Sequence, residues 1–315
     1  MKNTPCVIYG DELSQYHFGE EHPFGPHRYW AFKKEFDNRE LAKHVQLCQP
    51  QNATKQQLSL FHTPEYIDQA KHLSEKGVGF LDYGDTPARQ GIFDAACTVV
   101  GSTLTAIDHI MKGDCRHAFN PIGGLHHAAR TRAAGFCVFN DCGIAIEYLR
   151  QQYNIRRIAY VDIDAHHGDG VFYAFEDDKD LIIVDFHQDG NTLYPGTGFT
   201  DETGIKTAVG TKLNVPLPPE CSNETALKIW ESAEDFIDKF KPDFIILQCG
   251  ADSIEGDPIT QLKLTSEFHK HVTQRLCSLA KKHASGRLLA LGGGGYNLKN
   301  IACGWNDVIE AMIFE

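Results

Sequence analysis

The chain has 315 residues, of which 42% are hydrophobic and 23% charged, a balance typical of one globular domain with a sizeable core over residues 1–315. Its formal net charge of −12 argues against a nucleic-acid partner, which needs a basic stripe, and would attract basic peptide segments. The first residues carry no signal peptide, and no apolar run reaches the ~20 residues that span a bilayer, so we expect a cytoplasmic protein without a membrane partner.

Short runs rich in Val, Ile and Leu alternate with stretches of helical periodicity along the chain. We predict strands at 6–9, 117–120, 157–164, 181–187, 244–250 and 287–293. Helices are predicted over 92–111 and around 268–279, where apolar residues recur every three or four positions. Because most of these strands are apolar on both faces, the predicted fold class is α/β: an open, doubly wound, mostly parallel sheet with helices on both faces. Ligands bind beyond the carboxyl ends of the strands in such sheets.

Ten cysteines are scattered along the chain without a CxxC pair. Several of them, such as Cys97, Cys249 and Cys277, lie inside apolar runs. This pattern predicts reduced cysteines packed in the core and argues against structural zinc held by cysteine.

The segment VDIDAHHGDG follows an apolar run and places five ionisable residues at the end of a predicted strand. In an extended chain, side chains two positions apart share a face, so Asp164 and His166 point the same way. Asp252 follows the predicted strand 244–250 and supplies a third candidate ligand. Three protein ligands with open positions are typical of catalytic zinc, and mixed oxygen and nitrogen donors also accept Fe(II), Co(II) or Mn(II). The alternative is that all three residues only cap turns and loops.

Two adjacent histidines, His126 and His127, follow the predicted strand 117–120. Histidine titrates near neutrality and can take a proton from water and return it to a leaving amine. Asp162 and Asp169 are candidate carboxylates to orient them. The alternative is a pair of structural histidines.

The run Gly292 to Gly295, followed by Tyr296, comes after the last predicted strand. It lacks a following Lys-Ser/Thr and the GxGxxG spacing, which argues against a nucleotide-binding loop. Glycines let the backbone pass close to a ligand, and the Tyr296 hydroxyl can donate a hydrogen bond to a developing oxyanion.

Long segments along nearly the whole chain resemble the histone deacetylase superfamily, which has an arginase-like α/β fold. The matching segments are YHFGEEHPFGPHR, FHTPEYID, GDTP, GIFDAA, GGLHHAARTRAAGFCVFND, YVDIDAHHGDGV, FHQDGNTLYPGTG, LQCGADSIEGDP and LGGGGYNL. The N-terminal HPFGPHR is most similar to the class I and bacterial acetoin-utilisation branches.

The resemblance implies roles for the candidate site residues. The implied metal ligands are Asp164, His166 and Asp252. The implied active-site histidines and the carboxylates behind them are His126, His127, Asp162 and Asp169. His127 would act as the proton shuttle and His126 as its electrostatic partner, while Tyr296 would clamp the acetyl carbonyl.

The resemblance also implies a narrow channel for a lysine side chain. The Gly135 carbonyl would accept a hydrogen bond from the substrate amide, and Phe136 and Tyr194 would form the aromatic walls. Asp85 at the rim would hold substrate backbone amides. Arg28 would line a pocket through which acetate leaves.

Monovalent-cation sites, usually for potassium, are a further expectation from the family. The residues at the inner site would be Asp162, Asp164, His166, Asp185 and Phe186. Asp185 stands where many class I members have serine, which makes this site more anionic.

The reaction implied by the resemblance is the zinc-dependent hydrolysis of N-ε-acyl-lysine in a protein or peptide, with release of acetate. The alternatives are an acetylpolyamine or another small acylated amine as substrate, a ureohydrolase of the same fold with two metals, and a non-catalytic acyl-lysine-binding scaffold. Ile259 stands where the polyamine branch has a glutamate gatekeeper, which favours acetyl-lysine.

Overall fold

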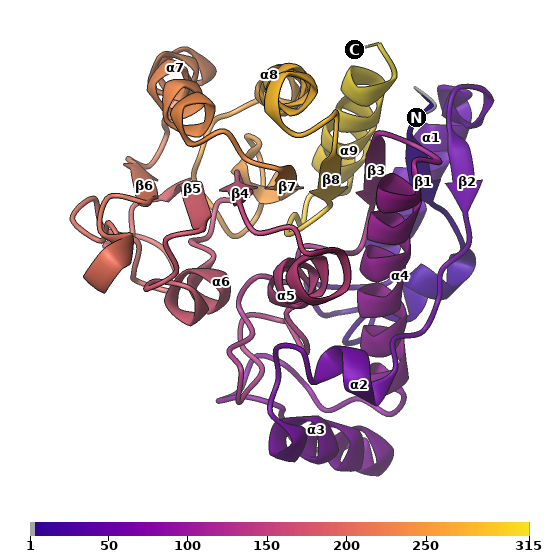
Figure 1. Cartoon of the computed structure of the whole chain (residues 1–315). Helices are drawn as coiled ribbons and strands as arrows, with labels where there is room; N and C mark the ends of the chain where they lie inside the picture. The colour runs from indigo at the N-terminus through magenta and orange to yellow at the C-terminus, as the bar shows by residue number, and fades with distance from the viewer. Residues whose placement is uncertain (1–3, 315) are drawn as a thin grey trace.

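Within residues 4–314, all eight strands run parallel in one sheet, in the order β2-β1-β3-β8-β7-β4-β5-β6 (Figure 1). The computed structural model describes residues 4–314. The strands are β1 (Cys6–Ile8), β2 (Gln46–Cys48), β3 (His117–Asn120), β4 (Ile158–Asp162), β5 (Leu181–Gln188), β6 (Lys212–Leu217), β7 (Phe244–Gln248) and β8 (Leu288–Leu291). The predicted fold class is therefore confirmed.

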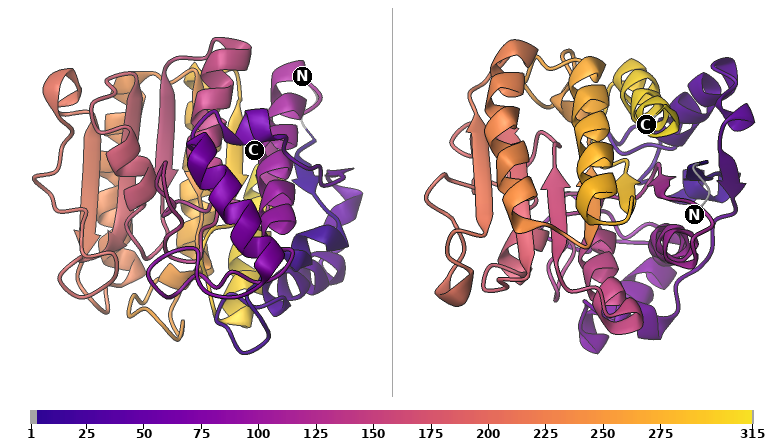
Figure 2. Two further views of the ribbon diagram at one scale, coloured as in Figure 1. Left: turned by 90° about the horizontal axis from the view of Figure 1, so that it is seen from below. Right: turned by 45° about the horizontal axis from the view of Figure 1, so that its top comes forward.

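Helices cover both faces of this sheet. The helices are α1 (His27–Asn38), α2 (Lys55–Leu58), α3 (Pro64–Lys76), α4 (Ile92–Lys112), α5 (Asp141–Tyr153), α6 (Asp169–Ala174), α7 (Asn223–Phe240), α8 (Ser266–His283) and α9 (Leu298–Ile313). Figures 1 and 2 show α7, α8, α9 and α1 along one face and α4, α5 and α6 along the other. Outside them, α2 packs on α5 and α3 packs on α4. Among residues 4–314, no helix combines the length and the apolar character needed to cross a bilayer.

Every residue of β4, β5 and β7 is buried, as expected of strands covered on both sides. The helix predicted over 92–111 is α4, which ends where Gly113 adopts a left-handed conformation (φ 81°). The helix predicted around 268–279 lies within α8.

Two edge strands, β2 and β6, were not predicted from the sequence. β2 has only three residues, too few for a periodicity. β6 contains Pro216, which cannot donate a hydrogen bond to a neighbouring strand and is tolerated because β6 lies at the sheet edge.

The strand predicted over 157–164 ends at Asp162, and the one predicted over 244–250 ends at Gln248. Beyond β4, the backbone N–H of Asp164 donates to Asp162 Oδ1 at 3.1 Å, and that of His166 donates to Asp164 Oδ1 at 3.0 Å. Such side-chain bonds compete with a strand ladder and turn the chain. Asp164 and His166 therefore come together through a turn, not through the strand alternation we expected.

The central strands β3, β8, β7 and β4 are neighbours, so their carboxyl ends lie side by side. The segments 121–127, 292–296, 249–253 and 163–169 follow these four strands and contain the candidate histidines, tyrosine and ligands. The sheet therefore gathers residues that are more than 170 positions apart into one place.

Candidate active site

Three buried side chains converge just beyond β4 and β7. The candidate ligand atoms of Asp164, His166 and Asp252 all lie within 4.8 Å of one another. His166 Nδ1 lies 3.1 Å from Asp164 Oδ1 and 3.1 Å from Asp252 Oδ2. Asp252 belongs to the 3₁₀ turn η4 (Ala251–Ser253).

The donor chemistry of this trio fits a divalent cation. Two buried carboxylates and one imidazole leave uncompensated negative charge, which is costly away from water. Burial and then the charge of Asp164 raise the pKa of Asp252 to about 7, a direct sign of this crowding. Mixed carboxylate and imidazole donors suit Zn²⁺, and also Fe(II) or Co(II).

Backbone and amide groups hold the two carboxylates in place. Asp164 Oδ2 accepts hydrogen bonds from the Gly294 N–H and from Gln248 Nε2, both at 2.8 Å. Asp252 Oδ1 accepts one from the Ala165 N–H at 2.8 Å. The glycine loop can approach so closely only without side chains, since a Cβ at Gly294 would lie 2.2 Å from Asp252 Oδ2.

The adjacent histidines form a pair beside this trio, and each has its own carboxylate. His126 Nδ1 donates to Asp162 Oδ2 at 2.8 Å, and His127 Nδ1 donates to Asp169 Oδ1 at 2.7 Å. Their Nε2 atoms face each other at 3.1 Å. The ring of His127 lies 5.8 Å from that of His166, centroid to centroid.

The two histidines have opposite pKa shifts. Burial lowers the pKa of His126, but the carboxylates of Asp162 and Asp164 outweigh it and raise that pKa above its usual value. Burial and the neighbouring His126 lower the pKa of His127, against the opposing effect of Asp169. At neutral pH this favours a cationic His126 and a neutral His127, so the pair holds both a proton donor and a proton acceptor.

An inner hollow opens onto the histidine pair and onto two members of the trio, Asp164 and His166. Its lining residues are Phe24, Gly124, Leu125, His126, His127, Gly135, Cys137, Asp164, His166, Gly293, Gly294 and Tyr296. The Tyr296 N–H donates to Asp257 Oδ2 at 2.7 Å, and its ring packs edge-on against Phe136 at 5.9 Å. The structure thus brings Tyr296 to the same hollow as Asp164 and His166.

Arg28 is buried behind the glycine loop. Its Nε donates to the Gly295 carbonyl at 2.8 Å and its Nη2 to the Gly293 carbonyl at 2.6 Å. Its Nη1 is buried and has no hydrogen-bond partner among residues 4–314, and the guanidinium lies 3.8 Å from the centre of the Phe24 ring. The acetate-exit role of Arg28 stays a prediction.

The predicted channel residues lie around the mouth of the hollow. Gly135 and Phe136 both have positive φ, at 53° and 65°. The Gly135 carbonyl faces the Cys137 thiol, whose Sγ lies at 3.3 Å. The half-exposed Tyr194 packs edge-on against His127 at 5.1 Å.

An outer hollow adjoins this mouth, lined by Asp82, Tyr83, Gly84, Asp85, Arg132, Ala133, Ala134, Asp169, Tyr194 and Pro195. Thr86 Oγ1 donates to Asp85 Oδ1 at 3.2 Å. Burial and the neighbouring Asp82 raise the pKa of Asp85 to about 7. The predicted rim residue Asp85 therefore lies at the mouth, beside a second carboxylate.

The remaining predicted site residues do not line the inner hollow. Ile259 is 37% exposed in the loop that follows Asp252. Asp185 pairs in register with Asp162, and its Oδ1 accepts from His187 Nδ1 at 2.7 Å, so His187 offsets the extra negative charge expected there. Phe186 packs its ring on Trp230 at 5.8 Å. The potassium site remains a prediction.

Sequence reasoning missed two residues that support the site. Gln248 joins Asp164 to the Gly250 N–H, which donates to Gln248 Oε1 at 2.7 Å. Asp257 accepts hydrogen bonds from the N–H groups of Tyr296 and Asn297. A polar residue directly after the apolar run FIIL was the available signal for Gln248, whereas a loop aspartate gave none.

His167, the histidine of VDIDAHHGDG without an assigned role, points away from the trio. Its Nδ1 lies 2.9 Å from Thr197 Oγ1, and its ring lies 4.9 Å from that of His187.

Comparison with known proteins agrees with this geometry. The family model described as "Histone deacetylase domain" matches residues 22–312. The acetoin utilization protein AcuC of Bacillus subtilis (strain 168) is 37% identical over 305 aligned positions, covering 92% of this chain and 77% of that protein. AcuC of Staphylococcus xylosus is 34% identical over 325 aligned positions, covering 100% of this chain and 84% of that protein. The crystal structure of the HDA15 HD domain matches with a TM-score of 0.90 at 26% identity, covering 100% of this chain and 90% of that one. The chain therefore belongs to the histone deacetylase family.

Proposed function

We propose that this chain is a zinc-dependent deacetylase that hydrolyses N-ε-acetyl-lysine side chains and releases acetate. The observation that carries the proposal is the cluster of Asp164, His166 and Asp252, which lies against a histidine pair backed by two carboxylates. Membership of the histone deacetylase family supports the same chemistry.

A zinc ion held by the three ligands would supply Lewis acidity toward an amide carbonyl and a water molecule. His127, whose Nδ1–H is held by Asp169, accepts the proton of that water at Nε2 and later returns it to the leaving amine. His126 stays cationic beside Asp162 and stabilises the negative charge that develops in the hollow. The Tyr296 hydroxyl donates a hydrogen bond to the oxyanion.

The mouth of the hollow supports lysine as the acyl carrier. Phe136 and Tyr194 offer aromatic surface to an aliphatic stem, and the rim carboxylates of Asp82 and Asp85 suit the backbone amides or basic residues of a peptide. Ile259 is apolar and offers nothing to the distal ammonium of a polyamine.

The test is a kcat/KM comparison on zinc-loaded protein with acetyl-lysine peptides, longer acyl-lysine peptides and acetylated polyamines. We expect the acetyl-lysine peptide to have the largest kcat/KM and Asp252→Asn to lose both zinc and turnover. Asp189→Asn, an aspartate outside both hollows, is the control that should change neither.

Two outcomes would contradict the proposal. A larger kcat/KM for acetylated polyamines would make the protein a small-molecule amidohydrolase. Tight binding of acetyl-lysine peptides by zinc-loaded protein, without hydrolysis of any substrate, would identify a non-catalytic binding scaffold.

A further inference from the structure

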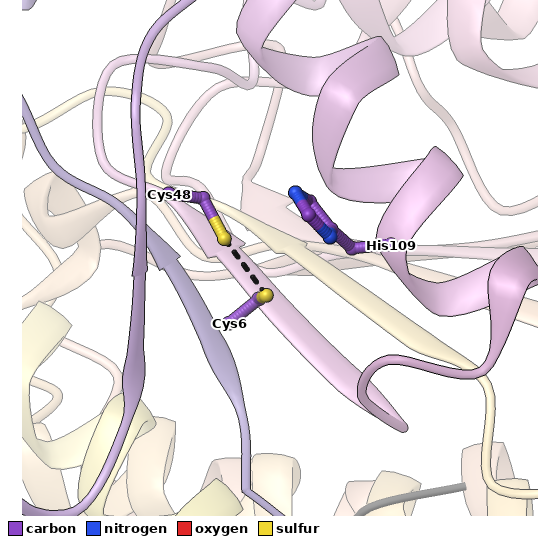
Figure 3. A group of neighbouring side chains, drawn as sticks. All are labelled: Cys6, Cys48 and His109. Atoms are coloured by element: carbon purple, nitrogen blue, oxygen red, sulfur yellow. Dashed lines mark hydrogen bonds between the residues drawn. The ribbon is translucent and has the colours of Figure 1, made fainter.

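A second cluster of potential metal ligands lies at the β1–β2 edge of the sheet. Cys6 begins β1, Cys48 ends β2, and His109 lies in the last turn of α4 (Figure 3). The sulfurs of Cys6 and Cys48 are 2.9 Å apart, and the donor atoms of all three residues lie within 4.8 Å of one another. None of these residues lines the inner or the outer hollow.

The strand register explains why the two thiols meet. Cys6 lies opposite Gln46, and Cys48 lies opposite Ile8. The two cysteines are therefore offset by two positions along the strands. Side chains two positions apart on a strand share a face, and both thiols therefore point to the same side of the sheet. The end of α4 brings the His109 imidazole to that side (Figure 3).

His109 is oriented as metal-binding histidines commonly are. Its Nδ1 donates to Asp114 Oδ2 at 3.0 Å, which leaves Nε2 as the free donor atom. A carboxylate on the other ring nitrogen fixes the tautomer and raises the basicity of a ligating histidine. The side chain of His109 is 28% exposed, so the cluster lies near the protein surface.

The donor set of this cluster is two sulfurs and one imidazole nitrogen. Thiolate sulfur and imidazole nitrogen are donors that suit Zn²⁺, and three protein ligands leave the fourth tetrahedral position to water. The sequence hides this set, because its members lie at positions 6, 48 and 109 without any short spacing.

We propose that Cys6, Cys48 and His109 bind a zinc-class divalent cation that is separate from the active site. Each thiol binds as a thiolate and releases its proton to solvent when the ion enters. The ion joins the edge strand β2 and its neighbour β1 to the end of α4, and therefore stabilises this part of the fold. This proposal does not depend on the proposed deacetylase activity.

Cobalt substitution tests the proposal, because of the two ligand clusters found within residues 4–314 this one has thiols among its ligand groups and the trio has none. Full-length protein is reduced, stripped of metal and titrated with Co²⁺, while the sulfur-to-cobalt charge-transfer band is followed in the near ultraviolet. We expect a thiolate band in the wild-type protein, which also binds Co²⁺ at the trio. Asp252→Asn lacks a ligand of the trio, and in this variant the same band should saturate at one Co²⁺ per chain. Cys48→Ser should abolish the band. Cys97→Ser, a buried thiol about 18 Å from His109 along α4, should keep it.

The proposal is overturned if the reduced wild-type protein shows no thiolate band, or if Cys48→Ser keeps it. A Cys6–Cys48 disulfide in protein purified and titrated under reducing conditions would also overturn it. If Cys48→Ser does not fold, His109→Gln removes a ligand from a partly exposed position. We then expect a Co²⁺ affinity at least tenfold weaker and a shifted band, and an unchanged affinity and band would refute the site.

Discussion

Replacing Gly294 with alanine should impair metal binding at the Asp164–His166–Asp252 site without changing any ligand. A Cβ at this position would lie 2.2 Å from Asp252 Oδ2 and 2.8 Å from Asp164 Oδ2, whereas ordinary contact begins at 3.4 Å. The Asp252 carboxylate would therefore have to move by about 1.2 Å. Gly294 is not among the glycines with positive φ, so alanine can adopt its backbone and the effect is steric.

The surrounding hydrogen bonds set the size of the effect. Asp252 cannot shift without weakening its bond from the Ala165 N–H, and Asp164 is tied to the Gly294 N–H itself. Metal sites tolerate ligand displacements of about 0.2 Å, and loss of a single supporting contact already lowers affinity by about 10–100-fold. We therefore expect Gly294→Ala to bind zinc at this site at least ~100-fold more weakly than the wild type.

The assay is a zinc affinity measured by competition with a chelator, together with kcat/KM at limiting zinc. In these experiments Cys48 is replaced by serine in every variant, so that the proposed thiol site does not contribute. Gly210→Ala is the matched control, because nothing lies within 4 Å of its Cβ and only its φ of 82° is unfavourable. It should lose about 1 kcal/mol of stability and no zinc affinity. Wild-type affinity in Gly294→Ala would refute the assignment of this trio as the metal site.

Three further outcomes are expected. Tyr296→Phe should lower kcat by about 10²–10³-fold with unchanged zinc content, because one oxyanion donor is lost, and an unchanged kcat would remove Tyr296 from the mechanism. Gly135→Ala should also lower kcat, because its Cβ would lie 2.4 Å from His127 Cδ2 and displace that ring, while zinc is retained. A loss of zinc as large as the loss of kcat would show that the substitution disturbs more than His127. Burial lowers the pKa of His62 to about 3, whereas the pKa of this histidine is near its usual 6.5 in the unfolded chain. As the pH falls below 6.5, the unfolded state binds a proton that the folded state does not, and the free energy of unfolding decreases. We expect the free energy of unfolding, measured with urea, to fall by about 2 kcal/mol less between pH 7 and pH 5 in His62→Gln than in the wild type. An equal fall in both proteins would contradict the lowered pKa of His62.

The sheet was predictable where its strands are apolar on both faces. β3 was predicted with its observed bounds, and β4, β5, β7 and β8 within two residues at each end. The resemblance to the histone deacetylase superfamily was also confirmed. The edge strands were not predictable, since β2 is too short for a pattern and the proline in β6 disguises a strand.

The candidate site was predictable to the extent that parallel strands align their carboxyl ends. Asp164, His166 and Asp252 follow neighbouring strands, so their convergence follows from the fold. The sequence did not predict which carboxylate binds which histidine, because this pairing depends on the turn after β4. Gln248 was missed for a related reason: strand alternation does not show what a buried polar group reaches across the sheet.

The charges of VDIDAHHGDG show where a cation is needed. Asp162 is matched by a histidine from another loop, and so is Asp169. Asp164 has no histidine to itself, because the single imidazole of His166 contacts both Asp164 and Asp252. If His166 uses Nδ1 to bind a metal, that imidazole is neutral, and two buried carboxylates remain without a counter-charge. A divalent ion supplies the two positive charges that balance these carboxylates. Asp164 is the one carboxylate of VDIDAHHGDG that needs such an ion, since Asp162 and Asp169 are each paired with a histidine.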